Sequence, residues 1–175
     1  MEVLRSSARR SCGRRVVITG IGIVSPLGIG KDKNWGAVLQ GKSGVSRISR
    51  FDASAFPVQI AGEARDFDPL DFIDRKEARK MDLFIQFAIA AARLAVEDAG
   101  IDPALLEGER TGVYVGSGIG GISTIEENHR ILLEKGVDRV SPFFLVASII
   151  NEAAGQISIK YRSRGPNSAT ASVLD

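Results

Sequence analysis

The sequence has 175 residues, 44% of them hydrophobic and 25% charged, which is typical of one folded domain in water. It has no run of about 18 apolar residues, so a membrane span is not predicted. A single cysteine, Cys12, excludes an internal disulfide framework and a Cys-based zinc cluster. A single histidine, His129, is too few for a multi-histidine metal site. We expect no metal, no cofactor and a cytoplasmic location.

The net charge of +2 conceals a division along the chain. Residues 1–15 hold five arginines and one glutamate, a net charge of +4, so the rest of the chain carries −2. A basic surface for nucleic acid is therefore not predicted. We predict that residues 1–13 are a basic disordered tail, or the product of a start codon assigned too far upstream. Their serine and arginine content also has a weak similarity to an organelle targeting segment.

Strands alternate with helices along the rest of the chain. In chain order, the sequence predicts a buried strand at 16–19, a helix at 32–39 capped by Asp32, an edge strand at 58–64, a long helix at 74–100, a buried strand at 111–115, helices at 123–135 and 141–161, and a final strand at 167–173. The alternation predicts an α/β fold with largely parallel strands. No helix follows the final strand to cover the sheet, so the fold is expected to be incomplete.

The segment Gly116–Gly121 reads GSGIGG between a predicted strand and a predicted helix. This matches the dinucleotide motif G-x-G-x-x-G, but no strand with a terminal acid follows at the usual distance. The glycines can equally serve a tight turn with close packing. A dinucleotide-binding domain therefore stays open as one alternative.

A basic cluster occupies the start of the long predicted helix, at Arg75, Lys76, Arg79 and Lys80. Three of these residues share one helical face by their spacing. Cations at a helix N-terminus oppose the macrodipole by about 0.3–1 kcal/mol each, so the placement is electrostatically unfavourable. The cluster is either a solvated face or a docking patch for an acidic partner.

None of the candidate nucleophiles or bases has the neighbours that catalysis requires. Cys12 lies in the basic tail without an ordered base beside it. His129 lies in a predicted helix with no partner nucleophile, and Ser117 has no His–Asp pair to activate it.

Six strings occur together, and in the same order as in one known family. They are RRVVITGIGIVSPLG (14–28), SGV with the FDAS turn (43–54), RKEARKMDLFIQFA (75–88), VGSGIGGISTIEENH (115–129), SPFFLVASIINEAAGQISI (141–159) and RGPNSAT (164–170). On these strings the chain resembles the elongating β-ketoacyl-acyl-carrier-protein synthases, in particular the synthase II type of fatty acid biosynthesis.

The resemblance implies a thiolase-like fold of five αβαβα layers, usually paired as a homodimer. Residues 14–175 would be a truncated β-ketoacyl synthase N-terminal domain, most of the first half of that fold. The implied activity is an acyltransferase reaction: an acyl group moves to a cysteine, then condenses with malonyl carrier protein as carbon dioxide leaves. Two histidines and a lysine from the second half assist. The implied partner is acyl carrier protein, with no nucleic acid or membrane.

The resemblance also assigns roles by position. Leu174 stands where the cysteine nucleophile is expected, so no catalytic residue is assigned and the chain alone is expected to be inactive, as after a frameshift or a truncated gene model. Lys76, Arg79 and Lys80 match the carrier-protein-binding patch, while Ile119 and Phe144 match residues of the acyl pocket. The alternative is a non-catalytic carrier- or partner-binding module.

Overall fold

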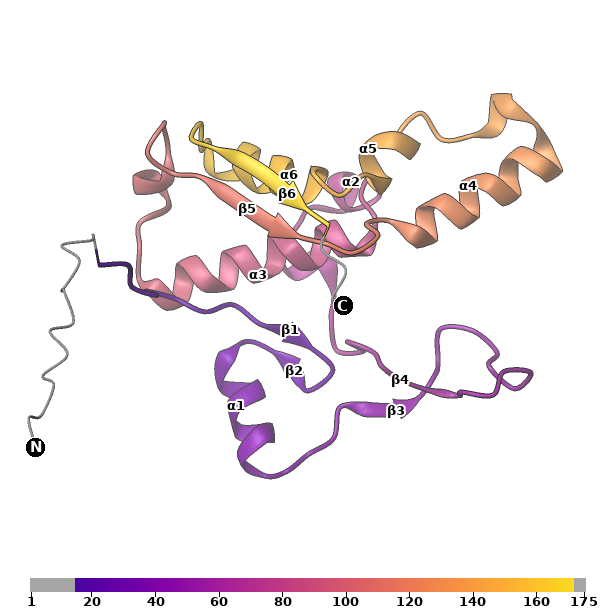
Figure 1. Ribbon diagram of the computed structural model, residues 1–175, viewed down its shortest axis with the longest axis horizontal. Coiled ribbons are helices and arrows are strands. Elements are labelled where there is room, and N and C mark those ends of the chain that lie inside the picture. The colour runs from indigo at the N-terminus through magenta and orange to yellow at the C-terminus, as the bar shows by residue number, and fades with distance from the viewer. Residues whose placement is uncertain (1–14, 172–175) are drawn as a thin grey trace, which may run out of the picture.

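The computed structural model describes residues 15–171, whose elements form two groups on either side of a central helix (Figure 1). In chain order they are β1 (Val24–Ser25), β2 (Gly28–Ile29), α1 (Lys31–Leu39), β3 (Val45–Arg47), β4 (Ile60–Gly62), η1 (Pro69–Asp71), α2 (Arg75–Ala78), α3 (Leu83–Ala99), η2 (Pro103–Leu106), β5 (Val113–Gly116), α4 (Ile122–Lys135), η3 (Val137–Arg139), α5 (Phe144–Ser148), α6 (Glu152–Tyr161) and β6 (Asn167–Thr170).

The core lies where α3 and α6 pack together beneath one pair of strands. Ile85 and Ile89 of α3 meet Ala153 and Ile157 of α6, and all four side chains are buried. Half-buried side chains surround them: Ile73, Met81, Phe84, Ala88, Ala92, Val113, Val115 and Tyr161. Burial of each large aliphatic side chain contributes about 1.5–3 kcal/mol, so this cluster stabilises the upper group of elements in Figure 1.

The strand pairing confirms one part of the predicted sheet and corrects another. Strands β5 and β6 are parallel, with Val113 opposite Asn167, as the alternation of strands and helices predicts. The other two pairs, β1–β2 and β3–β4, are antiparallel. The prediction of largely parallel strands is therefore correct for one of the three pairs described within residues 15–171.

The predicted buried strand at 16–19 is wrong. In residues 15–23 the structure assigns no strand, and Val16 and Ile18 are 93% and 84% exposed. A β-branched run becomes a strand only when another strand pairs with it, and no described strand does so here. The chain is instead held against α3, where the backbone N–H of Ile21 donates to Asp98 (3.0 Å).

The long helix predicted over 74–100 is two helices, α2 and α3. The backbone leaves the helical path at 79–82, and Asp82 begins a new helix by accepting from the Phe84 N–H. The periodic apolar positions continue across the break, which is why the pattern predicts one helix. The predicted end at Gly100 is confirmed.

Two further helix predictions are wrong, one about where a helix is interrupted and one about its N-cap. The helix predicted over 141–161 divides into α5 and α6, because residues 149–151 leave the helical path between them. Gly30, rather than Asp32, is the N-cap of α1, and Asp32 lies in the first turn instead.

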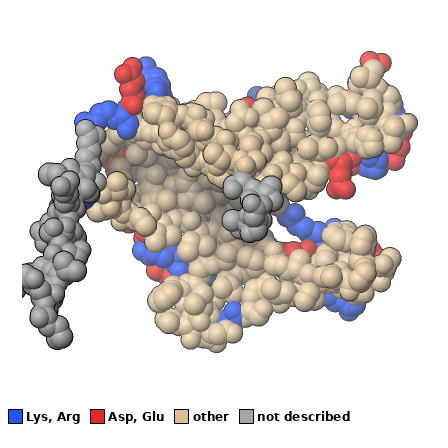
Figure 2. Space-filling view, viewed as in Figure 1, with Lys and Arg blue, Asp and Glu red and all other residues tan. Residues whose placement is uncertain are grey.

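Uncharged residues cover the centre of the face in Figure 2, and charged side chains lie mainly at its margins. Many large apolar side chains are exposed, among them Trp35, Val38, Leu39, Phe51, Leu133 and Leu145.

None of the helices between residues 15 and 171 has the length and apolar character that crossing a bilayer requires.

Close backbone contact with α3 explains two glycines of the N-terminal segment. A Cβ added at Gly22 would lie 1.9 Å from the Ala91 carbonyl oxygen, and one at Gly20 would lie 2.1 Å from that of Ala95. Both neighbours are backbone atoms of a regular helix, which cannot move aside as a flexible side chain can.

Gly22→Ala is therefore expected to lower the free energy of unfolding by about 1–3 kcal/mol or more, because it overpacks this contact. Gly36→Ala is the matched control, because a Cβ at Gly36 of α1 meets nothing within 4 Å. Alanine there should raise stability by about 0.5–1 kcal/mol through helix propensity. Urea unfolding of both variants tests this, and equal stabilities for wild type and Gly22→Ala would contradict it.

Glu63 fastens the ribbon formed by β3 and β4. Its carboxylate accepts from the Ser49 hydroxyl (2.8 Å), from the backbone N–H groups of Ser49 and Arg50, and from Arg65 Nε (3.1 Å). The Ser49 hydroxyl is the largest cause that lowers the pKa of Glu63, which falls to about 2. The charged form of Glu63 is therefore the one that holds the ribbon.

Because the pKa of Glu63 is lower in the folded state, its carboxylate stabilises the fold at pH values above the ordinary pKa of a glutamate. That stabilisation is lost as the pH falls toward 2. Wild type should therefore lose stability between about pH 4.5 and pH 2 more steeply than Glu63→Gln. Urea unfolding across this range measures the difference, with Glu126→Gln on α4 as an exposed control that should keep the wild-type profile. Parallel profiles for wild type and Glu63→Gln would refute the role of Glu63.

Candidate functional site

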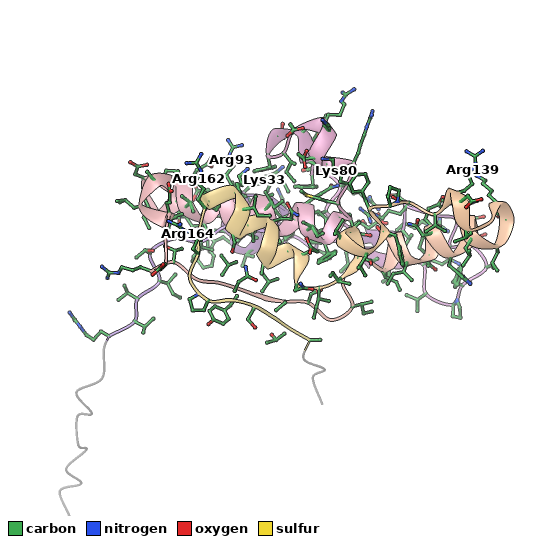
Figure 3. The ribbon with its side chains drawn as sticks, turned by 90° about the horizontal axis from the view of Figure 1, so that it is seen from above. Lys33, Lys80, Arg93, Arg139, Arg162 and Arg164 are labelled. Atoms are coloured by element: carbon green, nitrogen blue, oxygen red, sulfur yellow. The ribbon has the colours of Figure 1, made fainter. Side chains whose placement is uncertain are left out.

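The predicted docking residues lie on and just after α2, a single turn that stands out from the helical layer (Figure 3). Asp74 caps this turn by accepting from the backbone N–H groups of Lys76 (3.0 Å) and Glu77 (3.1 Å). Buried Ala78 anchors it. The capping carboxylate at the positive end of the helix offsets part of the unfavourable placement of the cations.

The three basic side chains differ in their surroundings. Lys76 and Arg79 are exposed, and within residues 15–171 neither forms an ion pair. Lys80, labelled in Figure 3, is half-buried, pairs with Glu77 (2.7 Å) and lies 5.7 Å from the centre of the Phe143 ring. Lys76 and Arg79 are thus the members most available to an acidic partner.

A hollow of about 280 Å³ joins the basic residues to one predicted acyl-pocket residue. Arg79, Lys80 and Phe144 all line it. Its remaining lining is Met81, Ser123, Thr124, Glu127, Asn128, Ser141, Phe143 and Ala147. The structure therefore brings together predicted residues that are far apart in the sequence.

The other predicted acyl-pocket residue, Ile119, is 66% exposed in the glycine-rich turn and does not line this hollow. A Cβ at Gly120 or Gly121 would lie 2.5 Å or 2.7 Å from carbonyl oxygens at the end of α5. Close packing against α5 thus requires glycine at 120 and 121, whereas a Cβ at Gly116 or Gly118 would meet nothing within 4 Å, so packing explains only the last glycine of the motif.

Two polar side chains that the sequence analysis did not single out organise the walls of the hollow. Buried Asn128 donates to the Thr124 carbonyl oxygen (2.9 Å) and accepts from the Ser141 N–H (2.9 Å), joining the chain before α5 to α4. Asp82 accepts from both the backbone N–H and the hydroxyl of Thr124 (2.9 and 2.7 Å). The position of Asp82 ahead of an apolar run is a capping signal, but its partner Thr124 is remote in sequence.

The remaining predicted candidates that lie within residues 15–171 form no catalytic set. His129 is exposed on α4, and the Ser117 hydroxyl accepts from the Gly120 N–H (3.1 Å). No group of three acidic, histidine or cysteine side chains capable of holding a metal occurs within residues 15–171. Cys12, the 1–13 tail and Leu174 lie outside the described residues.

Comparison with known proteins supplies an independent identification. A family model described as "Beta-ketoacyl synthase, N-terminal domain" matches residues 13–173. The chain is 54% identical over 154 residues to "3-oxoacyl-[acyl-carrier-protein] synthase 2" of Coxiella burnetii. That match covers 88% of this chain and 37% of that protein, so the chain spans about two fifths of the length of its relative.

Solved structures agree on the fold. "The ishigamide ketosynthase/chain length factor" superposes with a TM-score of 0.82 at 29% identity, over 90% of this chain and 40% of the other. A type II ketosynthase in complex with its acyl-carrier protein, "AntDE:AntF", superposes with a TM-score of 0.65 at 25% identity, over 83% of this chain and 38% of the other. The fold is therefore thiolase-like and incomplete, as predicted.

Asn128→Ala should lower the free energy of unfolding by about 1–3 kcal/mol, because the Ser141 N–H then loses its acceptor. Glu126→Ala, two residues earlier on the exposed face of α4, is the control and should change stability by less than about 0.5 kcal/mol. Urea unfolding compares them, and equal effects would show that the bond to Ser141 contributes nothing specific.

Proposed function

The chain belongs to the β-ketoacyl synthase family, and we propose that it serves the 3-oxoacyl-[acyl-carrier-protein] synthase reaction of fatty acid biosynthesis. In this reaction an acyl thioester condenses with malonyl carrier protein, and carbon dioxide is lost. The observation that carries the proposal is the 54% identity, over 88% of this chain, to a protein of that name.

The proposed partner is acyl carrier protein, recognised by Lys76, Arg79 and Lys80. Support comes from the exposure of Lys76 and Arg79 and from the fold similarity to a ketosynthase bound to its carrier. An exposed basic patch attracts an acidic partner over about 10 Å at 0.1 M salt, so it speeds association and depends on ionic strength.

We further propose that Ile119 and Phe144 line the acyl path, with Phe144 close to a second copy of the chain in a homodimer. Exposed apolar side chains beside Phe144, at Phe143 and Leu145, support an interface there. The hollow that Phe144 shares with Arg79 and Lys80 would then lie between the carrier and the acyl group.

We propose that residues 14–175 are a truncated β-ketoacyl synthase N-terminal domain and that this chain by itself does not condense acyl groups. Leucine has no nucleophilic atom, so Leu174 cannot form the acyl thioester on which the reaction depends. The same residue favours the second candidate function, a carrier-binding module without catalysis. Carrier binding is common to both candidates, and condensing activity separates them.

Binding of acyl carrier protein, measured by titration calorimetry, tests the docking proposal. Reversing two charges with Lys76→Glu and Arg79→Glu should weaken binding at least about tenfold, because attraction becomes repulsion. Wild-type binding should also weaken when salt rises from about 0.05 M to 0.3 M.

The matched control reverses one exposed lysine and one exposed arginine elsewhere, Lys42→Glu with Arg50→Glu. It changes the net charge equally and should leave affinity within about twofold. Equal losses in both double variants would contradict docking at α2. Condensation of malonyl carrier protein by the wild-type chain would contradict the proposed inactivity.

A further inference from the structure

We propose that Asp82 is a positioning residue that ties the docking segment (residues 75–80) to the glycine-rich turn (residues 116–121), so that carrier binding alters the turn. The inference rests on the proposed function of these two segments. It assigns Asp82 no contact with substrate.

One carboxylate links two helix beginnings. Asp82 Oδ1 accepts from the Phe84 N–H at 3.4 Å and caps α3. Asp82 Oδ2 accepts from the N–H and the hydroxyl of Thr124, in the first turn of α4. The N-termini of both helices therefore face the same negative charge, which both macrodipoles favour.

The docking side of this link is fastened to α3. The Gln86 amide donates to the carbonyl oxygens of Ala78 (2.9 Å) and Met81 (3.0 Å), which bracket Arg79 and Lys80. These bonds span the break between α2 and α3. The Gln86 backbone N–H also donates to the Asp82 carbonyl oxygen (3.3 Å), so Gln86 connects the docking segment to Asp82 and can pass on a displacement of Arg79 or Lys80 by a bound partner.

The glycine-rich turn also lies close to Asp82. A Cβ built at Gly121 would lie 3.0 Å from the Asp82 Cβ, and the Gly121 N–H donates to the Ser148 carbonyl oxygen (2.9 Å). The turn that carries Ile119 therefore abuts Asp82 directly, so hydrogen bonds and this close contact together connect the docking segment to the turn.

The substitution Asp82→Asn tests the bonds between Asp82 and Thr124 without removing the N-cap of α3. Asparagine caps helices as well as aspartate does, so its carbonyl oxygen can still accept from the Phe84 N–H. Its NH2 group would then face the Thr124 backbone N–H, which is only a donor and loses its acceptor, whereas the Thr124 hydroxyl can turn to accept from the amide. The variant keeps α3 capped and removes the acceptor of the Thr124 backbone N–H at the start of α4.

Hydrogen exchange on the carrier-free chain is the first test. Asp82→Asn and Thr124→Val should speed exchange of the 119–125 amides about tenfold, since hydrogen bonds to a carboxylate are lost. Thr124→Ser keeps the hydroxyl and should stay within about twofold of wild type. Asp74→Asn makes the same change at the cap of α2 and should leave these amides unaffected. Wild-type rates in Asp82→Asn, or equal acceleration in Asp74→Asn, would overturn the inference.

The second test adds acyl carrier protein. Saturating carrier should slow exchange at 119–125 at least about threefold in wild type. Asp82→Asn should bind carrier within about twofold of wild-type affinity but show no slowing. Binding without slowing in wild type, or equal slowing in the variant, overturns the coupling alone. Absence of binding by wild type overturns the docking proposal, and Asp82 is then only a structural link.

Discussion

The packing of α3 against α6 determines where the other described elements lie. Ile85 and Ile89 bury one side of α3 against α6 and the strand pair above it. Another side, lined by alanines, admits the backbone at Gly20 and Gly22. A single helix thus joins the upper and lower groups of elements, because its small residues allow contacts that larger side chains would prevent.

Local signals predicted a substantial part of this fold. The periodic apolar positions predicted α3, with its end at Gly100, and an apolar run ending in glycine predicted β5. Small residues after a Gly-Pro break predicted β6, and the alternation of strands and helices predicted its parallel pairing with β5. The same reasoning failed at residues 16–19, since pairing is decided by other strands and not by local composition. It also missed the break at Asp82, whose second partner, Thr124, is supplied by tertiary structure.

Part of the candidate site could also be predicted from the sequence, and part could not. Spacing on a helical face singled out the basic residues, and resemblance to a family gave them a partner. Neither could predict that Arg79 and Lys80 share a hollow with Phe144, because that meeting depends on how α4 and α5 fold back. Asn128 was missed because a buried amide looks like any polar residue on a helix until its partners are known.

The parallel pairing of β5 with β6 has a consequence for synthesis on the ribosome. Val113 pairs with Asn167, so β5 emerges long before its neighbour and must wait while α4, α5 and α6 are translated. During that interval its backbone N–H and C=O groups on this edge lack their eventual partners. The nascent chain therefore passes through a stage in which a short apolar strand is open to strands of other chains, a vulnerability that chaperones exist to manage.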